Sequence, residues 1–110
     1  MNWNSKQPVH TLGDGLKIFE PNTLLKKDGD KRILVITGKV TNETGKIIEM
    51  PLLKAILTGA EGKEVTSWTF MAKKSRVLPG EKVEYETVRE NPPTGATGLQ
   101  IIFTSEAHAG

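Results

Sequence analysis

One stretch decides the fold of this chain: Arg32-Ile33-Leu34-Val35-Ile36-Thr37-Gly38-Lys39-Val40-Thr41-Asn42. It is the longest β-like run, rich in β-branched residues, and turn signals flank it, Asp28-Gly29-Asp30 before it and Asn42 to Gly45 after it. It therefore predicts a central β-strand, with Leu34, Ile36, Gly38 and Val40 on one face. Because its first half is apolar on both faces, we expect that half to be buried on both sides.

The two segments that follow are predicted to be strands packed around this one. Leu52 to Thr58 is interpreted as a strand rather than a helix, because the apolar run is short and Pro51 precedes it. Glu64 to Met71 places Trp68 and Phe70 on one face. We expect the Trp68 ring to lie over the gap left by Gly38, since a glycine inside a strand indicates close approach by a large neighbour.

The second half of the chain carries the cleanest alternation. Lys82 to Val88 predicts a strand with Val83, Tyr85 and Thr87 inward and Lys82, Glu84 and Glu86 outward. Before it, Leu78-Pro79-Gly80-Glu81 predicts a type II turn, with Pro79 at its second position and positive φ at Gly80. Ala72 to Val77 is interpreted as a basic connection, and Leu99 to Thr104 as the last strand after a stiff Asn91-Pro92-Pro93 linker.

The first strand is expected to lie at a sheet edge or to bend at Pro21. Leu16 to Glu20 begins it, and Pro21 interrupts it, because proline cannot donate to a ladder; Leu24 and Leu25 are its possible continuation. The Asp28-Gly29 step then predicts a hairpin.

These segments favour an all-β fold, an antiparallel immunoglobulin-like β-sandwich of about seven strands, with a small closed barrel as the alternative. The expected organisation is a flexible N-terminal arm (1–15), one sandwich domain (16–105) and a C-terminal tail (106–110). The expected core side chains are Leu34, Ile36, Gly38, Val40, Leu53, Ala55, Leu57, Trp68, Phe70, Val83, Tyr85, Leu99, Ile101 and Phe103.

Composition excludes several classes of function. The 110 residues carry a formal charge of only +2, too little to indicate nucleic acid. The basic cluster of Lys26, Lys27, Lys31 and Arg32 is interpreted as solvated turn charge, with a phosphate or membrane-surface role as the alternative. The chain has no cysteine, which excludes disulfides, thiolate zinc sites and thiol nucleophiles. No apolar run approaches the roughly 20 residues of a membrane span, and we expect no direct membrane insertion by this chain.

No residues form a convincing catalytic, cofactor or metal site. His10 and His108, the only histidines, fall in the expected tails, and Glu84 with Glu86 is interpreted as solvated charge. The Asp28/Asp30 pair offers too few oxygens for calcium. Asn42-Glu43-Thr44 matches a glycosylation sequon, but an Asn that caps a turn is the preferred interpretation. We therefore expect a protein that is not an enzyme and holds no cofactor or metal.

Three features together resemble the bacterial DUF3426 domain, a domain of unknown function, and the similar FxLYD-type immunoglobulin-like domains. The first is Leu34-x-Ile36-x-Gly38-x-Val40-x-Asn42. The second is Pro51-x-Leu53-x-Ala55-x-Leu57, followed by Gly62 and Trp68-x-Phe70. The third is Leu78-Pro79-Gly80-Glu81 before an alternating strand, then Pro92-Pro93 and a final apolar strand. The resemblance covers Leu16 to Ser105 and transfers no catalytic residues. It implies the extracytoplasmic side of the bacterial envelope, with a tether supplied by a membrane helix outside this sequence; the cytoplasm is the alternative.

Three functions fit these expectations. The first is a protein-interaction module with an unknown protein partner, which predicts an exposed apolar patch or an unprotected strand edge. The second is a small-ligand or carbohydrate binder that uses Trp3, Trp68 or Tyr85 as a stacking ring. The third is a structural spacer with a polar, patch-free surface.

Overall fold

Nine β-strands build the part of the chain that the structure, a computed structural model, describes: residues 13–105. No helix in that range is long and apolar enough to cross a membrane. The strands are β2 (Leu16–Ile18), β3 (Asn22–Asp28), β4 (Lys31–Asn42), β5 (Ile48–Glu49), β6 (Leu52–Thr58), β7 (Glu64–Phe70), β8 (Arg76–Val77), β9 (Lys82–Glu90) and β10 (Gly98–Thr104), and a short 3-10 turn, η1 (Ala60–Gly62), joins β6 to β7.

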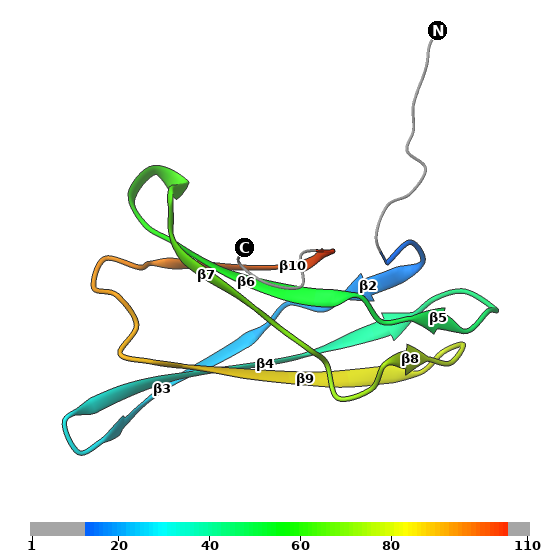
Figure 1. Ribbon diagram of the computed structural model, residues 1–110, viewed down its shortest axis with the longest axis horizontal. Coiled ribbons are helices and arrows are strands. Elements are labelled where there is room, and N and C mark those ends of the chain that lie inside the picture. Colours follow the sequence, from blue (N-terminus) through cyan, green and yellow to red (C-terminus); the bar gives the residue numbers. More distant parts are fainter. Residues whose placement is uncertain (1–12, 106–110) are drawn as a thin grey trace, which may run out of the picture.

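The strands form two facing antiparallel layers, which confirms the all-β sandwich (Figure 1). One layer contains β2, β3, β4 and β9, and the other has the order β10-β6-β7. The small β5–β8 pair lies at one end of the molecule, and the β3–β4 hairpin projects from the other (Figure 1). In each layer, alternate side chains of a strand point toward the other layer. We call this side of a layer its inner face and the opposite side its outer face.

β4 is the centre of the larger sheet, as its length and β-branched composition predict. β9 pairs along one side of it, while β2 and β3 share the other side. The two short strands are one edge strand broken around Pro21, whose missing N–H would leave a gap in any central ladder. The prediction of an interrupted edge strand is confirmed.

The second layer confirms that Leu52 to Thr58 is a strand. Its burial alternates along β6, with Leu53, Ala55 and Leu57 buried and their neighbours only half-buried. A helix would have shown a period near 3.6 residues. β10 and β7 flank β6 on either side, and both present their inner-face side chains to the same core.

The core lies between the layers and matches most of the expected residues. Ile36, Val40, Leu53 and Tyr85 form its fully buried centre. Ala55, Leu57 and Val83 are also buried, and Leu34, Trp68, Phe70, Leu99, Ile101 and Phe103 are partly buried and complete it. Val77 is fully buried although it was expected in a connection; it belongs to β8, a two-residue strand too short to show a period.

The prediction that Trp68 covers Gly38 is wrong. Tyr85 lies there: a Cβ atom on Gly38 would overlap the Tyr85 phenol ring. The reason is register, because Tyr85 is the direct cross-strand neighbour of Gly38 on β9 and shares its face. Trp68 belongs to the facing sheet and donates its indole N–H to Thr87 Oγ1 at 2.8 Å instead.

The end of the sandwich near β5 and β8 is closed by a buried asparagine. Asn42 is 1% exposed, and its amide donates to the carbonyls of Lys46 (2.6 Å) and Val77 (2.9 Å). Its Oδ1 accepts the Thr44 N–H at 2.8 Å, which confirms the prediction of a turn cap. The whole side-chain amide is thus used within the fold.

The turn before β9 docks on this closed end. Gly80 has φ 77° and Glu81 N–H donates to the Leu78 carbonyl at 2.9 Å, as a type II turn requires. Gly80 N–H donates to the Asn42 carbonyl, so the turn is joined to the end of β4. Hydrogen bonds from the Lys74 ammonium and the Leu78 N–H lower the pKa of Glu81, which sits in this turn.

Candidate functional site

The edge strand β3 is exposed along its whole length. Every residue from Asn22 to Asp28 is exposed, and among residues 13–105 only β4 pairs with it. Two leucines in this strand, Leu24 and Leu25, are 58% and 54% exposed. An exposed edge with apolar side chains is a template for pairing with another strand.

The hairpin geometry shows which backbone groups of β3 are free to pair. Asp28 is paired with Lys31 across a two-residue turn, and positive φ at Gly29 alone in that turn fits type II′. The N–H and C=O of Arg32 point to Asn91 next to β9, so those of Lys31 and Ile33 point toward β3. Backbone groups alternate in the same way along β3. The N–H and C=O groups of Thr23, Leu25 and Lys27 therefore point outward, away from β4.

The outer face of this end carries an apolar stripe across three strands. Leu24, Val35 and Val88 are direct cross-strand neighbours on β3, β4 and β9. Leu24 and Val88 are 58% and 48% exposed, and Val35 is half-buried. The prediction that the first half of the central strand is buried on both faces is therefore wrong, because no layer among residues 13–105 covers this outer face.

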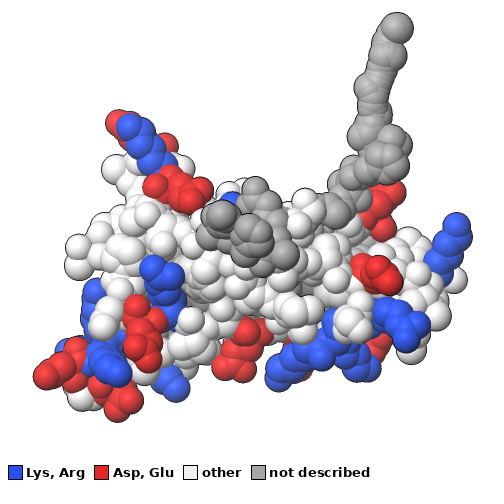
Figure 2. Space-filling model, viewed as in Figure 1, with Lys and Arg blue, Asp and Glu red and all other residues white. Residues whose placement is uncertain are grey.

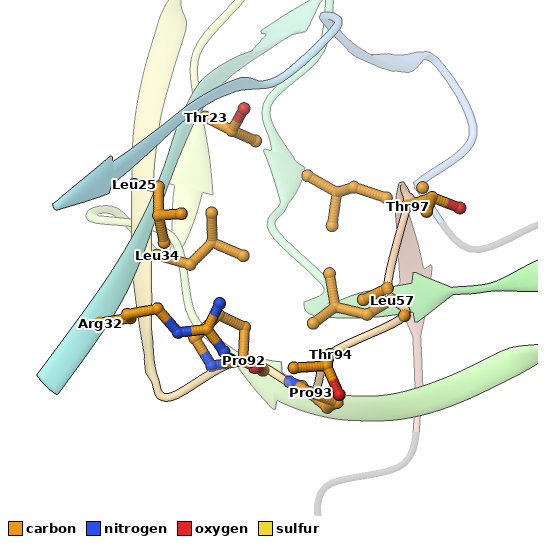
Figure 3. A pocket seen from close by; sticks show the side chains of 13 residues that line it. Thr23, Leu25, Arg32, Leu34, Leu57, Pro92, Pro93, Thr94 and Thr97 are labelled. Carbon is orange, nitrogen blue, oxygen red and sulfur yellow. Dashed lines mark hydrogen bonds between the residues drawn. The ribbon is translucent and has the colours of Figure 1, made fainter.

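An apolar cleft opens on the inner side of the same edge (Figure 3). It has a volume of about 450 Å³ and lies between the β3–β4 end of one sheet and β6 and β10 of the other. Leu25 and Leu34 line one side, facing Leu57 on the other (Figure 3). The remaining lining comes from Thr23, Arg32 and residues 92–99, the loop between β9 and β10 with the start of β10.

Arg32 is the only charged residue that lines this cleft. Its guanidinium donates to the Pro92 carbonyl at 2.9 Å, and its backbone N–H donates to Asn91 Oδ1 at 3.1 Å. Asn91 itself has positive φ (48°), a conformation that asparagine tolerates better than most residues. The loop thus holds the guanidinium beside an apolar opening, with no acidic group in ion-pair distance among the described residues.

A second cation lies beside Arg32 on the same face. Lys27 is its direct cross-strand neighbour, and like charges in that position repel each other. The nearby acids are on the other face: Asp28 is opposite Lys31, whose ammonium lies 3.9 Å from Glu90. Figure 2 shows charged side chains of both signs gathered at the tip of this hairpin.

The described aromatic residues considered as stacking platforms, Trp68 and Tyr85, do not line this cleft. Tyr85 is 1% exposed, and its hydroxyl has no hydrogen-bond partner in the described part of the protein. The Trp68 ring is half-buried, with the Arg89 guanidinium 5.0 Å from its centre. Trp3 lies outside the described residues. Tyr85 is therefore closed to a sugar, and the Arg89 guanidinium occupies one face of the Trp68 ring.

The residues weighed for chemistry do not come together. Glu84 and Glu86 are exposed on the outer face of β9, where Glu84 lies 3.8 Å from Lys73. His10 and His108 fall outside the described residues. Within residues 13–105 no three His, Cys, Asp or Glu side chains form a group that could hold a metal ion.

Comparisons with protein-family models, with curated proteins and with solved structures each found no match. Functional inference therefore rests on the geometry of this chain.

Sequence reasoning missed the cleft and the extent of β3. Leu24 and Leu25 were considered only as a continuation of the first strand, and Arg32 only as the start of the central strand and as solvated turn charge. A signal was available: cross-strand counting from the Gly29-Asp30 turn places Leu25 opposite Leu34 and Lys27 opposite Arg32. The loop that forms the other wall, 92–97, has no period that would reveal its position.

Proposed function

We propose that this domain is a non-enzymatic protein-interaction module that binds an extended segment of a partner protein along the free edge of β3. The observation that carries the proposal is an edge strand exposed at every residue, with outward backbone groups at 23, 25 and 27. Main-chain pairing at such an edge supplies affinity, and pockets for alternate side chains supply specificity. The cleft under β3 is such a pocket.

The exposed leucines favour this function over a structural spacer. A spacer needs a polar surface, whereas Leu24 and Leu25 place two large, exposed apolar side chains on one edge strand, and Val35 and Val88 continue the Leu24 stripe across β4 and β9. Natural edge strands are commonly blunted by charge. In β3 the charged residues, Lys26, Lys27 and Asp28, occupy only one end of the strand, and Asn22 to Leu25 carries no charge.

The resemblance to DUF3426 domains adds a proposal about the partner's location. If this chain is such a domain, its partner belongs to the extracytoplasmic side of a bacterial envelope, and a membrane helix elsewhere in the protein tethers it. This part of the proposal rests on the resemblance alone.

A peptide selection with the full chain tests the function. A display library of random linear peptides is selected against the chain, and amide hydrogen exchange then maps the enriched binders. Protection of the amides at 23, 25 and 27 supports strand addition. Protection confined to other residues, or the enrichment of no linear peptide, overturns it.

Two variants at Leu25 separate the backbone from the side chain. The Leu25 N–H points away from β4, so Leu25→Pro removes an edge donor without removing a hairpin bond. Leu25→Ala keeps the N–H and shortens the side chain. We expect binding to be lost in Leu25→Pro and only weakened in Leu25→Ala; equal binding by both variants contradicts strand addition.

A further inference from the structure

We infer that the segment received by β3 is acidic at one end and apolar at the other, with one apolar side chain inserted in the cleft and acidic side chains beside Lys26, Lys27 and Arg32. This inference rests on the proposed function and names the chemistry of its partner. The observation that carries it is an apolar opening beside Lys26, Lys27 and Arg32, none of which forms an ion pair within residues 13–105.

The sequence of β3 divides its edge into two chemically different halves. Leu24 and Leu25 are consecutive, so one faces outward and the other faces the cleft. Lys26 and Lys27 follow in the same way, one on each face. A strand paired with β3 therefore meets an apolar side chain on both faces at Leu24 and Leu25 and an ammonium group on both faces at Lys26 and Lys27. Asp28 follows on the outer face, so the inner face is the one without an acid.

On the inner face the partner position opposite Leu25 reaches the cleft. Directly opposed residues have Cβ atoms about 5 Å apart, so an apolar side chain there extends over the Leu25 and Leu34 wall. Two residues along the partner strand, the next inner-face position lies opposite Lys27. An acidic side chain there faces two cations, because Lys27 and Arg32 are cross-strand neighbours with no acid on their face of β3 or β4.

The loop wall of the cleft adds no negative charge beside Arg32. Residues 92–97 contain no charged side chain, so nothing on that wall attracts a base. Arg32 is already held at the rim by the Pro92 carbonyl, and a held guanidinium loses little freedom when it pairs with a carboxylate. On the outer face, Lys26 has Ile33 as its neighbour on β4 and does not face an acid directly.

The pairing direction sets the order of the partner sequence. An antiparallel partner has two acidic residues followed by two apolar ones, and a parallel partner has the reverse order. Two synthetic peptides with the cores Glu-Glu-Ile-Val and Val-Ile-Glu-Glu represent these cases. A third and a fourth peptide, with Lys in place of both Glu, are the matched controls.

Fluorescence anisotropy with the labelled peptides and the full chain is the test. One of the two acidic peptides should bind at least about tenfold tighter than its lysine counterpart, with the difference shrinking at high salt. Lys27→Glu should reverse that preference, while Lys82→Glu, the same charge change at the far end of the sandwich, should leave it nearly unchanged. Arg32→Gln should weaken the acidic peptide and leave an uncharged apolar peptide unaffected.

The possible failures are distinguishable. If peptides selected from the random library protect the β3 amides but show no acidic preference, this inference fails and the proposed function stands. If neither acidic peptide nor any library peptide protects β3, both fail. If the full chain sediments as a dimer with protected β3 amides, a second copy occupies the edge and the acidic partner is overturned.

Discussion

The two halves of β4 have opposite roles, although they form one continuous strand. From Ile36 to Asn42 it is flanked by β9 and the edge strand, its inner side chains are fully buried, and its end is fixed by Asn42. From Lys31 to Val35 its side chains are exposed or only half-buried, and its inner face borders an open cleft. One strand can therefore anchor the core at one end and support an exposed edge strand, β3, at the other.

This division has a physical origin in the edge strand and the loops. Near Asn42 the turn around Gly80 and the β5–β8 pair bring backbone N–H and C=O groups that form hydrogen bonds with one another. Near Arg32 the β3–β4 hairpin extends beyond the second sheet, so its side chains have little to pack against (Figure 1). Stability should therefore depend on the first half, and binding on the second.

The largest expected effect is at Gly38, in the buried half. Gly38→Val should reduce the free energy of unfolding by about 3 kcal/mol or more, because the new side chain displaces Tyr85 from the core. The backbone at Gly38 does not have positive φ, so the cost is steric and not conformational. Urea unfolding measures it.

Two variants check that Tyr85 is the cause. Gly45→Val is the matched control, since a Cβ at Gly45 has no atom within 4 Å, and it should change stability by less than about 0.5 kcal/mol. The losses in Gly38→Val and Tyr85→Ala should not add in the double variant, because both remove the same packing. Additive losses would show that another neighbour is affected.

The next effect is at Asn42, at the end of the same half. Asn42→Asp should cost about 2–3 kcal/mol at pH 7, because a carboxylate cannot donate to the carbonyls of Lys46 and Val77. Burial beside two carbonyls raises the pKa of the new carboxyl in the folded state, so the folded state binds more protons and the loss should shrink as the pH falls. Asn22→Asp, on the exposed edge, is the control. A pH-independent loss would argue against the burial of this amide.

The buried half could be predicted from the sequence, and the open half could not. Alternation along Leu52 to Thr58 and Lys82 to Val88 identified these two strands and their inner faces, because each strand has one more exposed face and one buried face. The same rule failed at Ile33 and Val35, where apolar side chains on both faces indicated burial. Alternation predicts which side chains share a face of a strand, but not whether another layer of the protein covers that face.

The alternation of apolar and polar residues also could not predict which particular side chains pack together. Gly38 indicated a large neighbour, but choosing Tyr85 over Trp68 requires the register of β9 against β4. The cleft requires the path of residues 92–97, which two prolines and a glycine set without any period. The β5–β8 pair contains only two residues on each strand, too few to alternate.

A smaller effect is expected from the buried Tyr85 hydroxyl, which has no hydrogen-bond partner within residues 13–105. Burial raises the pKa of Tyr85 above its ordinary value of about 10, so above that pH the unfolded chain loses this proton first. Stability should therefore fall as the pH rises past about 10. Tyr85 is the only tyrosine in the chain, so ultraviolet absorbance reports its ionisation alone, and ionisation should coincide with unfolding.

Tyr85→Phe completes that comparison. Removing a buried hydroxyl without a partner should be neutral or stabilise the protein by up to about 1 kcal/mol at pH 7, and should reduce the alkaline loss. A clear loss of stability at pH 7 would mean that the hydroxyl forms a hydrogen bond in solution.

The smallest effect is expected in the open half, at Leu25. Leu25→Ala should change the free energy of unfolding by less than about 0.5 kcal/mol, because the side chain is 54% exposed and borders a cleft on its buried side. Urea unfolding at two protein concentrations, tenfold apart, is the measurement. A loss above about 1 kcal/mol that grows with protein concentration would mean that Leu25 is covered by a second copy in solution, since only an association equilibrium makes stability depend on concentration. A negligible, concentration-independent change means that this leucine contributes little to folding, which leaves its exposed apolar surface to be explained by what the edge binds.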